Sequence, residues 1–154
     1  MIKLLARWLT TSNPSKKFRA ELDLMFWGAK HSRLVRRYFQ RRIFYVYNCD
    51  ISHSAEIHSS VKFPHPCGVV IGSKAKVAAG CHIYQQVTIG SDNSMAYIKK
   101  NTFIGSGAKL IGGIEIGENC HIGANAVVTK NFADDSTIVG NNHSITPRKP
   151  KTEK

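Results

Sequence analysis

The most regular feature of this 154-residue chain is an apolar residue that returns at every sixth position from Ile51 onward. A small or β-branched residue follows four places later in most units. The leading positions are Ile51, Ile57, Phe63, Ile71, Val77, Ile83, Ile89, Ile98, Ile104, Leu110, Ile116, Ile122 and Val128. A period of six fits neither a helix face nor an amphipathic strand. It predicts a parallel β-helix in which three six-residue units make one triangular coil.

Thirteen such units give a little over four coils, stacked about 4.8 Å apart like the strands of a sheet. Glycine follows the leading residue at five positions, where we expect tight corners that a Cβ would obstruct. These are Gly72, Gly90, Gly105, Gly117 and Gly123. The repeat does not set the handedness, because the usual crossover rule favours the right hand. A solenoid that only binds a partner is equally consistent with the pattern.

The repeat is interrupted twice. Phe63 and Ile71 are separated by eight positions, and the extra pair lies within residues 64–68, Pro-His-Pro-Cys-Gly. Ile89 and Ile98 are separated by nine, so residues 91–97 are predicted to form a loop outside the coils. Insertions between uniform coils are places where functional groups are mounted without disturbing the core.

The first interruption carries His65 between two prolines. Pro66 disfavours the α region for His65, so the imidazole is carried on stiff, extended backbone, which suits a general base. A histidine exposed at a proline-rich turn, without a catalytic role, is the competing interpretation. Asp50 precedes His65 by fifteen residues, close to one coil. We therefore expect Asp50 to lie beneath the imidazole and orient it.

The first 48 residues lack the repeat and are predicted to be helical. They carry eleven Lys or Arg against Glu21 and Asp23, whereas residues 49–154 carry eleven against eight acids. Ser15 is the predicted N-cap of a helix over residues 16–27. A second helix over residues 32–47 is predicted to form one apolar face from Leu34, Val35, Tyr38, Phe39 and Ile43. Residues 1–10 are too short and too charged for a secretory signal or a membrane-spanning helix.

The second predicted helix also carries five arginines, Arg33, Arg36, Arg37, Arg41 and Arg42. A solvated face of a helix packed on the end of the β-helix explains them most simply. A weak contact with an anionic membrane surface is the second interpretation. Nucleic acid is a distant third, and we expect no such partner, because no nucleic-acid-binding module accompanies the charge.

The four cysteines accompany no export signal and do not indicate disulfides. Cys81 and Cys120 occupy inward positions of the repeat, where burial explains them, and Cys49 is uninformative. Cys67 is an alternative acyl-carrying nucleophile, but nothing around it in the sequence indicates an activated thiol. His53 and His58 raise the alternative of a metal hydratase of the carbonic-anhydrase kind. A third histidine at a supporting spacing is missing, so no metal is expected.

Within the six-residue repeat the chain resembles serine acetyltransferases and the related bacterial capsule and exopolysaccharide O-acetyltransferases. The resemblance covers about residues 50–139. It is carried by Asp50-Ile51, by His65 with GVVIG at 68–72, by IYQQVTIG at 83–90 and by IGSGAKLIG at 104–112. It implies a mainly β protein, with a left-handed β-helix over residues 49–139. An α-helical segment (1–48) precedes it and a basic tail (140–154) follows it.

The resemblance also implies site residues and partners. His65 and Asp50 match the catalytic dyad, and Ser106, Gly107 and Ala124 fall where the groove wall contacts acetyl-CoA. Tyr84, Gln85 and Tyr97 are predicted to contact the acceptor. The family assembles as homotrimers with acetyl-CoA lying between the β-helices.

Two departures bear on the acceptor. Pro64 stands where serine acetyltransferases carry an acid, and Ser94-Met95 where they carry an Arg-His pair. Charge-assisted hydrogen bonds contribute about 1.5–3 kcal/mol each, so losing them weakens binding of a free amino acid. The sequence therefore predicts an acetyl-CoA-dependent O-acetyltransferase acting on a sugar or polysaccharide precursor. Serine O-acetyltransferase is the alternative, and a hydratase or a non-catalytic binding β-helix ranks below both. The expected location is the cytoplasm, including the inner face of the membrane.

Overall fold

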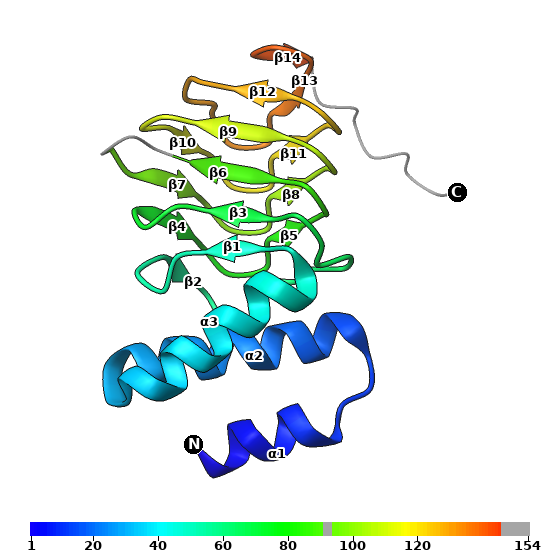
Figure 1. The fold of residues 1–154 in the computed structure, drawn as a ribbon. Coiled ribbons are helices and arrows are strands. Elements are labelled where there is room, and N and C mark those ends of the chain that lie inside the picture. Colours follow the sequence, from blue (N-terminus) through cyan, green and yellow to red (C-terminus); the bar gives the residue numbers. More distant parts are fainter. Residues whose placement is uncertain (91–93, 146–154) are drawn as a thin grey trace.

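The computed structural model describes residues 1–90 and 94–145 and has two parts (Figure 1). Three helices, α1 (Ile2–Thr10), α2 (Pro14–His31) and α3 (Arg33–Tyr47), form a layer at one end. A triangular prism of short strands rises from that layer, with β1 next to the helices and β14 at the far end. The chain is mainly β, a β-helix of the left-handed hexapeptide type with a helical N-terminal segment, which confirms the predicted fold.

The described strands form three sheets, one for each face of the prism. Face A has the order β1-β3-β6-β9-β12, face B β2-β4-β7-β10, and face C β5-β8-β11-β13-β14. Pairing is parallel except between β13 and β14. The bounds are β1 Asp50–Ile51, β2 Glu56–Ile57, β3 Val70–Ile71, β4 Ala75–Val77, β5 His82–Ile83, β6 Thr88–Gly90, β7 Ala96–Ile98, β8 Phe103–Ile104, β9 Lys109–Ile111, β10 Glu115–Ile116, β11 His121–Ile122, β12 Val127–Val128, β13 Thr137–Val139 and β14 His143–Ile145.

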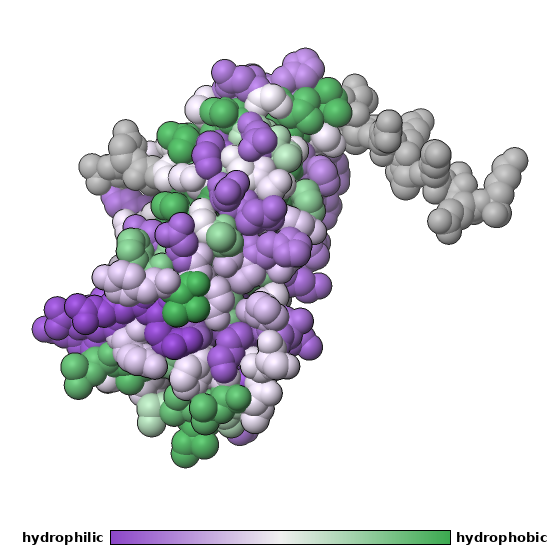
Figure 2. Space-filling model, turned by 45° about the vertical axis from the view of Figure 1, so that its right-hand side comes forward, coloured by the Kyte–Doolittle hydropathy of each residue, from purple (hydrophilic) through white to green (hydrophobic). Residues whose placement is uncertain are grey.

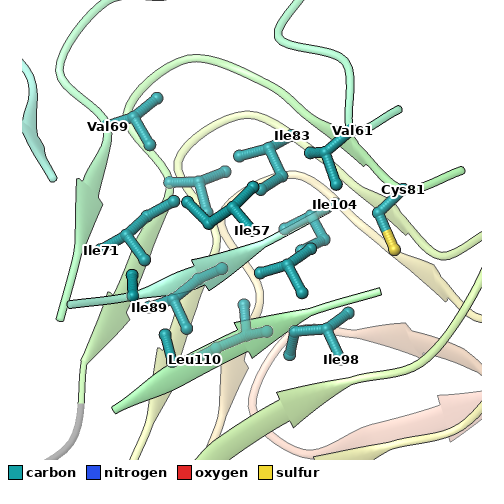
Figure 3. Close-up of a cluster of buried hydrophobic side chains, with 14 of the residues drawn as sticks. Ile57, Val61, Val69, Ile71, Cys81, Ile83, Ile89, Ile98, Ile104 and Leu110 are labelled. Carbon is teal, nitrogen blue, oxygen red and sulfur yellow. The ribbon is translucent and has the colours of Figure 1, made fainter. Parts of the chain in front are cut away.

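The core follows the six-residue repeat. Every leading residue from Ile51 to Val128 is buried. The small or β-branched residues four places after most of them are buried as well: Ala55, Val61, Ala75, Cys81, Val87, Thr102, Ala108, Ile114, Cys120 and Ala126. Neighbouring coils place like residues above one another, as Ile71, Ile89 and Leu110 show in Figure 3. Val128 is the last leading residue of the regular repeat, but Ile138 in β13 is also fully buried, within the predicted β-helix of residues 49–139.

One edge of the prism is built from a column of left-handed corners. Asn48, Gly68, Gln86, Gly107 and Asn125 all have φ between 53° and 72°. From Gly68 onward, each corner residue donates its backbone N–H to the carbonyl of the residue that precedes the corner one coil earlier, for example Gln86 N to Cys67 O (2.8 Å) and Gly107 N to Gln85 O (2.9 Å). We call this set the corner column. Asn48 is also the C-cap of α3, so the helix leads directly into the first coil.

The prediction that a Cβ would obstruct the positions after the leading residues is confirmed at Gly105 and Gly117, whereas a Cβ on Gly90 would make only ordinary contacts at 3.9 Å. Gly72, Gly90, Gly105, Gly117 and Gly123 do not adopt left-handed φ. Some of them are needed for close stacking instead: a Cβ on Gly105 would lie 2.7 Å from Ala124 N, and one on Gly117 would lie 2.4 Å from Asp134 N. Asparagine fills several of the left-handed corners, because its short amide side chain tolerates that conformation.

The helix boundaries differ from the prediction. Asn13 rather than Ser15 caps α2, accepting a hydrogen bond from Lys16 N (3.0 Å), with Pro14 at the first helical position. This arrangement is common, because proline lacks an N–H that would be unpaired there. Ser32 caps α3 as the predicted start implied. None of the described helices is long and apolar enough to cross a membrane.

The predicted apolar face of α3 is only partly buried. Phe39 and Ile43 are buried and Val35 is half-buried, but Leu34 is 79% exposed and Tyr38 is 52% exposed. The reason is that α3 packs mainly against α2, and nothing described covers its outer side. Residues Leu34 and Tyr38 therefore face outward.

The helical layer is joined to the prism by buried contacts. The ring of Phe18 lies 4.9 Å from that of Tyr47 and 5.1 Å from that of Phe63. Glu21 is fully buried and accepts hydrogen bonds from Arg42 (3.0 Å) and from Trp8 Nε1 (2.9 Å). The hydrogen bond to Glu21 raises the pKa of Arg42. These contacts fix the first corner, next to which the candidate site lies.

Candidate active site

His65 lies at the corner between Phe63 and β3, and its side chain is exposed. Cys67 N donates to His65 O (2.9 Å), which closes a tight turn around Pro66. The rigid turn thus presents an imidazole to solvent at the first interruption of the repeat. This is the accessible position that a general base acting on a hydroxyl group needs.

Four aromatic rings from successive coils form a ladder that begins at His65. The ring centroid of Tyr84 lies 6.0 Å from that of His65 and 5.0 Å from that of Phe103. Phe103 in β8 stacks on His121 in β11 at 4.4 Å with an interplanar angle of 7°. We call His65, Tyr84, Phe103 and His121 the aromatic ladder. It supports one side of the His65 ring, and it places Tyr84 beside His65.

Asp50 begins β1 on face A and is exposed. It pairs in register with Val70, two residues after the corner at Gly68, whereas His65 lies three residues before that corner. The two residues therefore flank one corner of the prism. No hydrogen bond or ion pair joins them within the described residues. Orientation of His65 by Asp50 stays a prediction.

Gln85 lies next to the corner column, between Tyr84 and Gln86. Its side-chain Oε1 is buried and has no hydrogen-bond partner among the described residues. A buried acceptor without a partner costs about 1–3 kcal/mol, so such a group calls for a partner, for example a water molecule or a bound group. Gln85 is thus suited to accept a hydrogen bond from an acceptor hydroxyl.

Ser106, Gly107 and Ala124 lie on the same edge as His65, in higher coils. Asn125 N donates to Ser106 O (2.8 Å), which stacks the Ala124 corner directly on the Ser106 corner. Ser106 is half-buried and Ala124 is exposed. At about 4.8 Å per coil, the Ser106 corner lies about 10 Å along the edge from the Cys67 corner. An extended ligand lying along this edge would reach from Ala124 to His65.

Tyr97 lies elsewhere. It is in β7 on face B, where Lys76 Nζ lies 5.7 Å from the centre of its ring. Within a single chain, Tyr97 therefore does not lie beside His65. The loop prediction is wrong at its C-terminal end, because Ala96 is buried and pairs with Ala75. Residues 91–93 lie outside the described residues. The exposed Met95 follows them.

The cysteines and the possible metal ligands are the other candidate groups of the sequence. All four cysteines are free thiols, and burial raises the pKa of Cys49, Cys81 and Cys120. Cys67 is exposed beside His65. In the described part of the chain no three His, Cys, Asp or Glu side chains are grouped to hold a metal ion.

Sequence reasoning missed Phe103 and His121 as supports for the site. The signal was present, because each directly precedes a leading residue, Ile104 and Ile122 respectively. Residues at that position point outward on face C, and successive coils stack them. An outward aromatic repeated from coil to coil indicates a ladder.

Two family models match the chain. "Bacterial transferase hexapeptide (six repeats)" covers residues 95–130, and "Hexapeptide repeat of succinyl-transferase" covers residues 60–85. A curated relative, serine acetyltransferase of Buchnera aphidicola subsp. Schizaphis graminum, is 36% identical over 125 residues, which are 77% of this chain and 48% of the relative. The chain thus spans about half the length of this relative.

Solved structures agree on the fold. Serine acetyltransferase of Neisseria gonorrhoeae in complex with serine superposes with a TM-score of 0.77 at 25% identity, over 86% of this chain and 57% of that one. A serine acetyltransferase in complex with CoA superposes with a TM-score of 0.72 at 27% identity, over 86% and 56%. The prism of this chain is therefore a hexapeptide-repeat β-helix of the serine acetyltransferase type.

Proposed function

We propose that this chain transfers an acetyl group from acetyl-CoA to a hydroxyl group, with His65 as the general base. The observation that carries the proposal is the position of His65. An exposed, rigidly held imidazole lies at the foot of the same prism edge on which Ser106 and Ala124 lie. The likeness to serine acetyltransferases, one of them in complex with CoA, supports acetyl-CoA as the donor. No step requires a metal.

The proposed chemistry is direct transfer. His65 removes the proton from the acceptor hydroxyl, and the oxygen attacks the thioester carbonyl. The tetrahedral intermediate collapses with cleavage of the C–S bond, and the imidazolium returns its proton to the leaving thiolate. Backbone N–H groups near the groove would stabilise the oxyanion, a contribution of about 2.7–4 kcal/mol per donor. Asp50 would steady the imidazolium that forms in between.

L-Serine is the first candidate acceptor. The curated relative is named a serine acetyltransferase, and the Neisseria structure is a complex with serine. These comparisons favour the acceptor that the sequence alone ranks second.

A saccharide hydroxyl is the second candidate, and a specific observation favours it. The residue before His65 is the half-buried Pro64, and Ser94-Met95 lie within the second interruption. In the serine acetyltransferase pattern these positions carry ionic groups that hold the charged ends of an amino acid. A neutral sugar needs hydrogen bonds and an apolar or aromatic surface instead. Tyr84 and the unpaired Oε1 of Gln85 supply both.

Competition kinetics test the proposal and separate the acceptors. Purified protein is supplied with acetyl-CoA, L-serine and a saccharide together, and both products are quantified by mass. Conversion of L-serine to O-acetylserine alone supports the first candidate. A kcat/KM for the saccharide at least a hundredfold higher, about 2.7 kcal/mol in transition-state binding, supports the second. Failure to bind CoA would refute transferase activity altogether.

We also propose that the prisms assemble as a homotrimer on the cytoplasmic side, where acetyl-CoA is supplied. Face A supports this, because Val70, Ile111 and Val127 are 39%, 42% and 36% exposed on that face. Burying these side chains between prisms removes apolar surface from water. Light scattering coupled to size-exclusion chromatography tests the assembly, and a monomer at working concentrations would refute it.

A further inference from the structure

The outer side of α3 carries a row of exposed apolar and aromatic residues. Leu34 is 79% exposed, Tyr38 is 52% exposed and Tyr45 is 78% exposed, and their spacing of four and seven residues places them on one helix face. A groove of about 610 Å³ lies among them, lined also by Val46 and Arg41. Hydrophobic residues gather at the helical end of the molecule, with strongly hydrophilic residues beside them (Figure 2).

The same face carries positive charge that nothing in the described chain neutralises. Arg33, Arg37 and Arg41 are exposed and form no ion pair with any described residue. The two acids of the helical segment are already paired. Glu21 binds Arg42, and Asp23 binds Arg7 and Arg19. The face therefore combines unpaired guanidinium groups with apolar and aromatic side chains.

We propose that the outer face of α3 docks on an anionic lipid surface. Such a surface offers phosphate groups for the arginines, together with an interfacial layer in which Leu and Tyr side chains are stable. A second copy of the chain fits poorly, because paired α3 faces would bring the arginines of both copies together. Nucleic acid would satisfy the charges but leave Leu34 and Val46 without a partner.

The geometry links docking to the candidate site. The helical layer adjoins the first coil, which begins with β1 (Figure 1). His65 lies at the end of this coil, before β3. On α1, Ile2 (81% exposed) and Leu9 (68% exposed) lie seven residues apart on one helix face and add apolar surface to the same end of the molecule. Docking would therefore hold the His65 corner near the headgroups, where a lipid-linked acceptor is presented. This consequence rests on the proposed function, whereas docking itself does not.

Vesicle sedimentation of the full chain tests docking. The probes are vesicles of phosphatidylcholine alone and vesicles that also contain phosphatidylglycerol. Two charge-matched triple variants are compared, Arg33→Gln/Arg37→Gln/Arg41→Gln on α3 and Lys76→Gln/Lys100→Gln/Lys130→Gln on the prism. A third variant, Leu34→Ser/Tyr45→Ser, removes the apolar row. These side chains are exposed, and equal melting temperatures show that each variant is folded.

We expect binding to the anionic vesicles only, and weaker binding at higher salt. Each basic residue near an anionic surface contributes about fivefold, so the arginine variant should bind roughly a hundredfold more weakly. The serine variant should also bind more weakly, and the lysine variant should bind like the parent chain. Equal losses in both charge variants would overturn the proposal. So would unaltered binding of the arginine variant, tighter binding to a DNA duplex than to the vesicles, or self-association through α3.

Because this assay measures binding without turnover, its failure leaves the proposed transferase activity standing. Conversely, loss of acetyl transfer with intact vesicle binding would refute the transferase and not the docking face.

Discussion

The ring of Tyr84 lies 6.0 Å from the ring of His65, tilted by 58°, and is backed by Phe103 at 5.0 Å. This contact limits where the imidazole can rotate. Tyr84→Leu should therefore lower kcat about three- to tenfold, because an aromatic contact contributes about 0.5–1.5 kcal/mol. Tyr84→Phe keeps the ring and should leave kcat nearly unchanged. A rise in KM for the acceptor in both variants, with kcat intact, would instead assign the Tyr84 hydroxyl to acceptor binding.

Asp50 is the predicted partner of His65 across the corner at Gly68. Asp50→Asn should reduce kcat by roughly tenfold, and by less than loss of the base, whose contribution is about 10²–10⁴-fold. The reason is that an amide removes the charge that steadies the imidazolium but leaves the imidazole in place. Steady-state kinetics of the purified variant measure this. Full activity would show that Asp50 does not act on His65.

Gly107 allows a test of whether acetyl-CoA binds along the prism edge on which Ser106 and Ala124 lie. It has φ +72°, and an added Cβ would lie 2.0 Å from Asn125 Oδ1. Gly107→Ala should raise KM for acetyl-CoA and destabilise the fold by about 1–2 kcal/mol from backbone strain alone. Gly140→Ala is the matched control, with φ +58° and nothing within 4 Å of the added Cβ. It should show the strain without the change in KM. Denaturant melts and coenzyme titrations of both variants make the comparison.

The raised pKa of Tyr47 predicts how the stability of the fold depends on pH at the junction between the helices and the prism. Burial, together with the nearby Glu21 carboxylate, raises its pKa from 10.0 to about 12. A phenol with a raised folded-state pKa contributes stability that is fully present below pH 10 and is lost as the pH rises through 12. The unfolding free energy should therefore fall over this window. Tyr47→Phe should lessen that fall. An identical pH dependence in parent and variant would exclude Tyr47 as its source.

The six-residue period predicted most of the fold because each unit places one large and one small side chain in the core. The leading residues from Ile51 to Val128 therefore showed directly where the successive coils lie. The corners were harder, since left-handed φ can be met by asparagine or glutamine as well as glycine. Asn48, Gln86 and Asn125 show that the backbone position, not the residue type, recurs.

Only part of the candidate site could be predicted from the sequence. His65 and Tyr84 come together because one coil of the repeat separates them, which a period makes visible. Tyr97 was predicted to lie in a loop near the acceptor. The prediction was wrong because the length of the nine-residue interruption does not show which of its residues belong to the next strand. The burial of Leu34 could not be predicted, because a helical period shows an apolar face without showing whether another element covers it.

The most direct test of the account is acetyl transfer by His65→Ala, measured together with CoA binding. Since His65 is exposed, its removal should leave the melting temperature and the Kd for CoA nearly unchanged. We predict that kcat falls by about 10²–10⁴-fold with the preferred acceptor. A variant that binds CoA normally and keeps more than about a tenth of the activity, far above that range, would contradict the assignment of His65 as the general base.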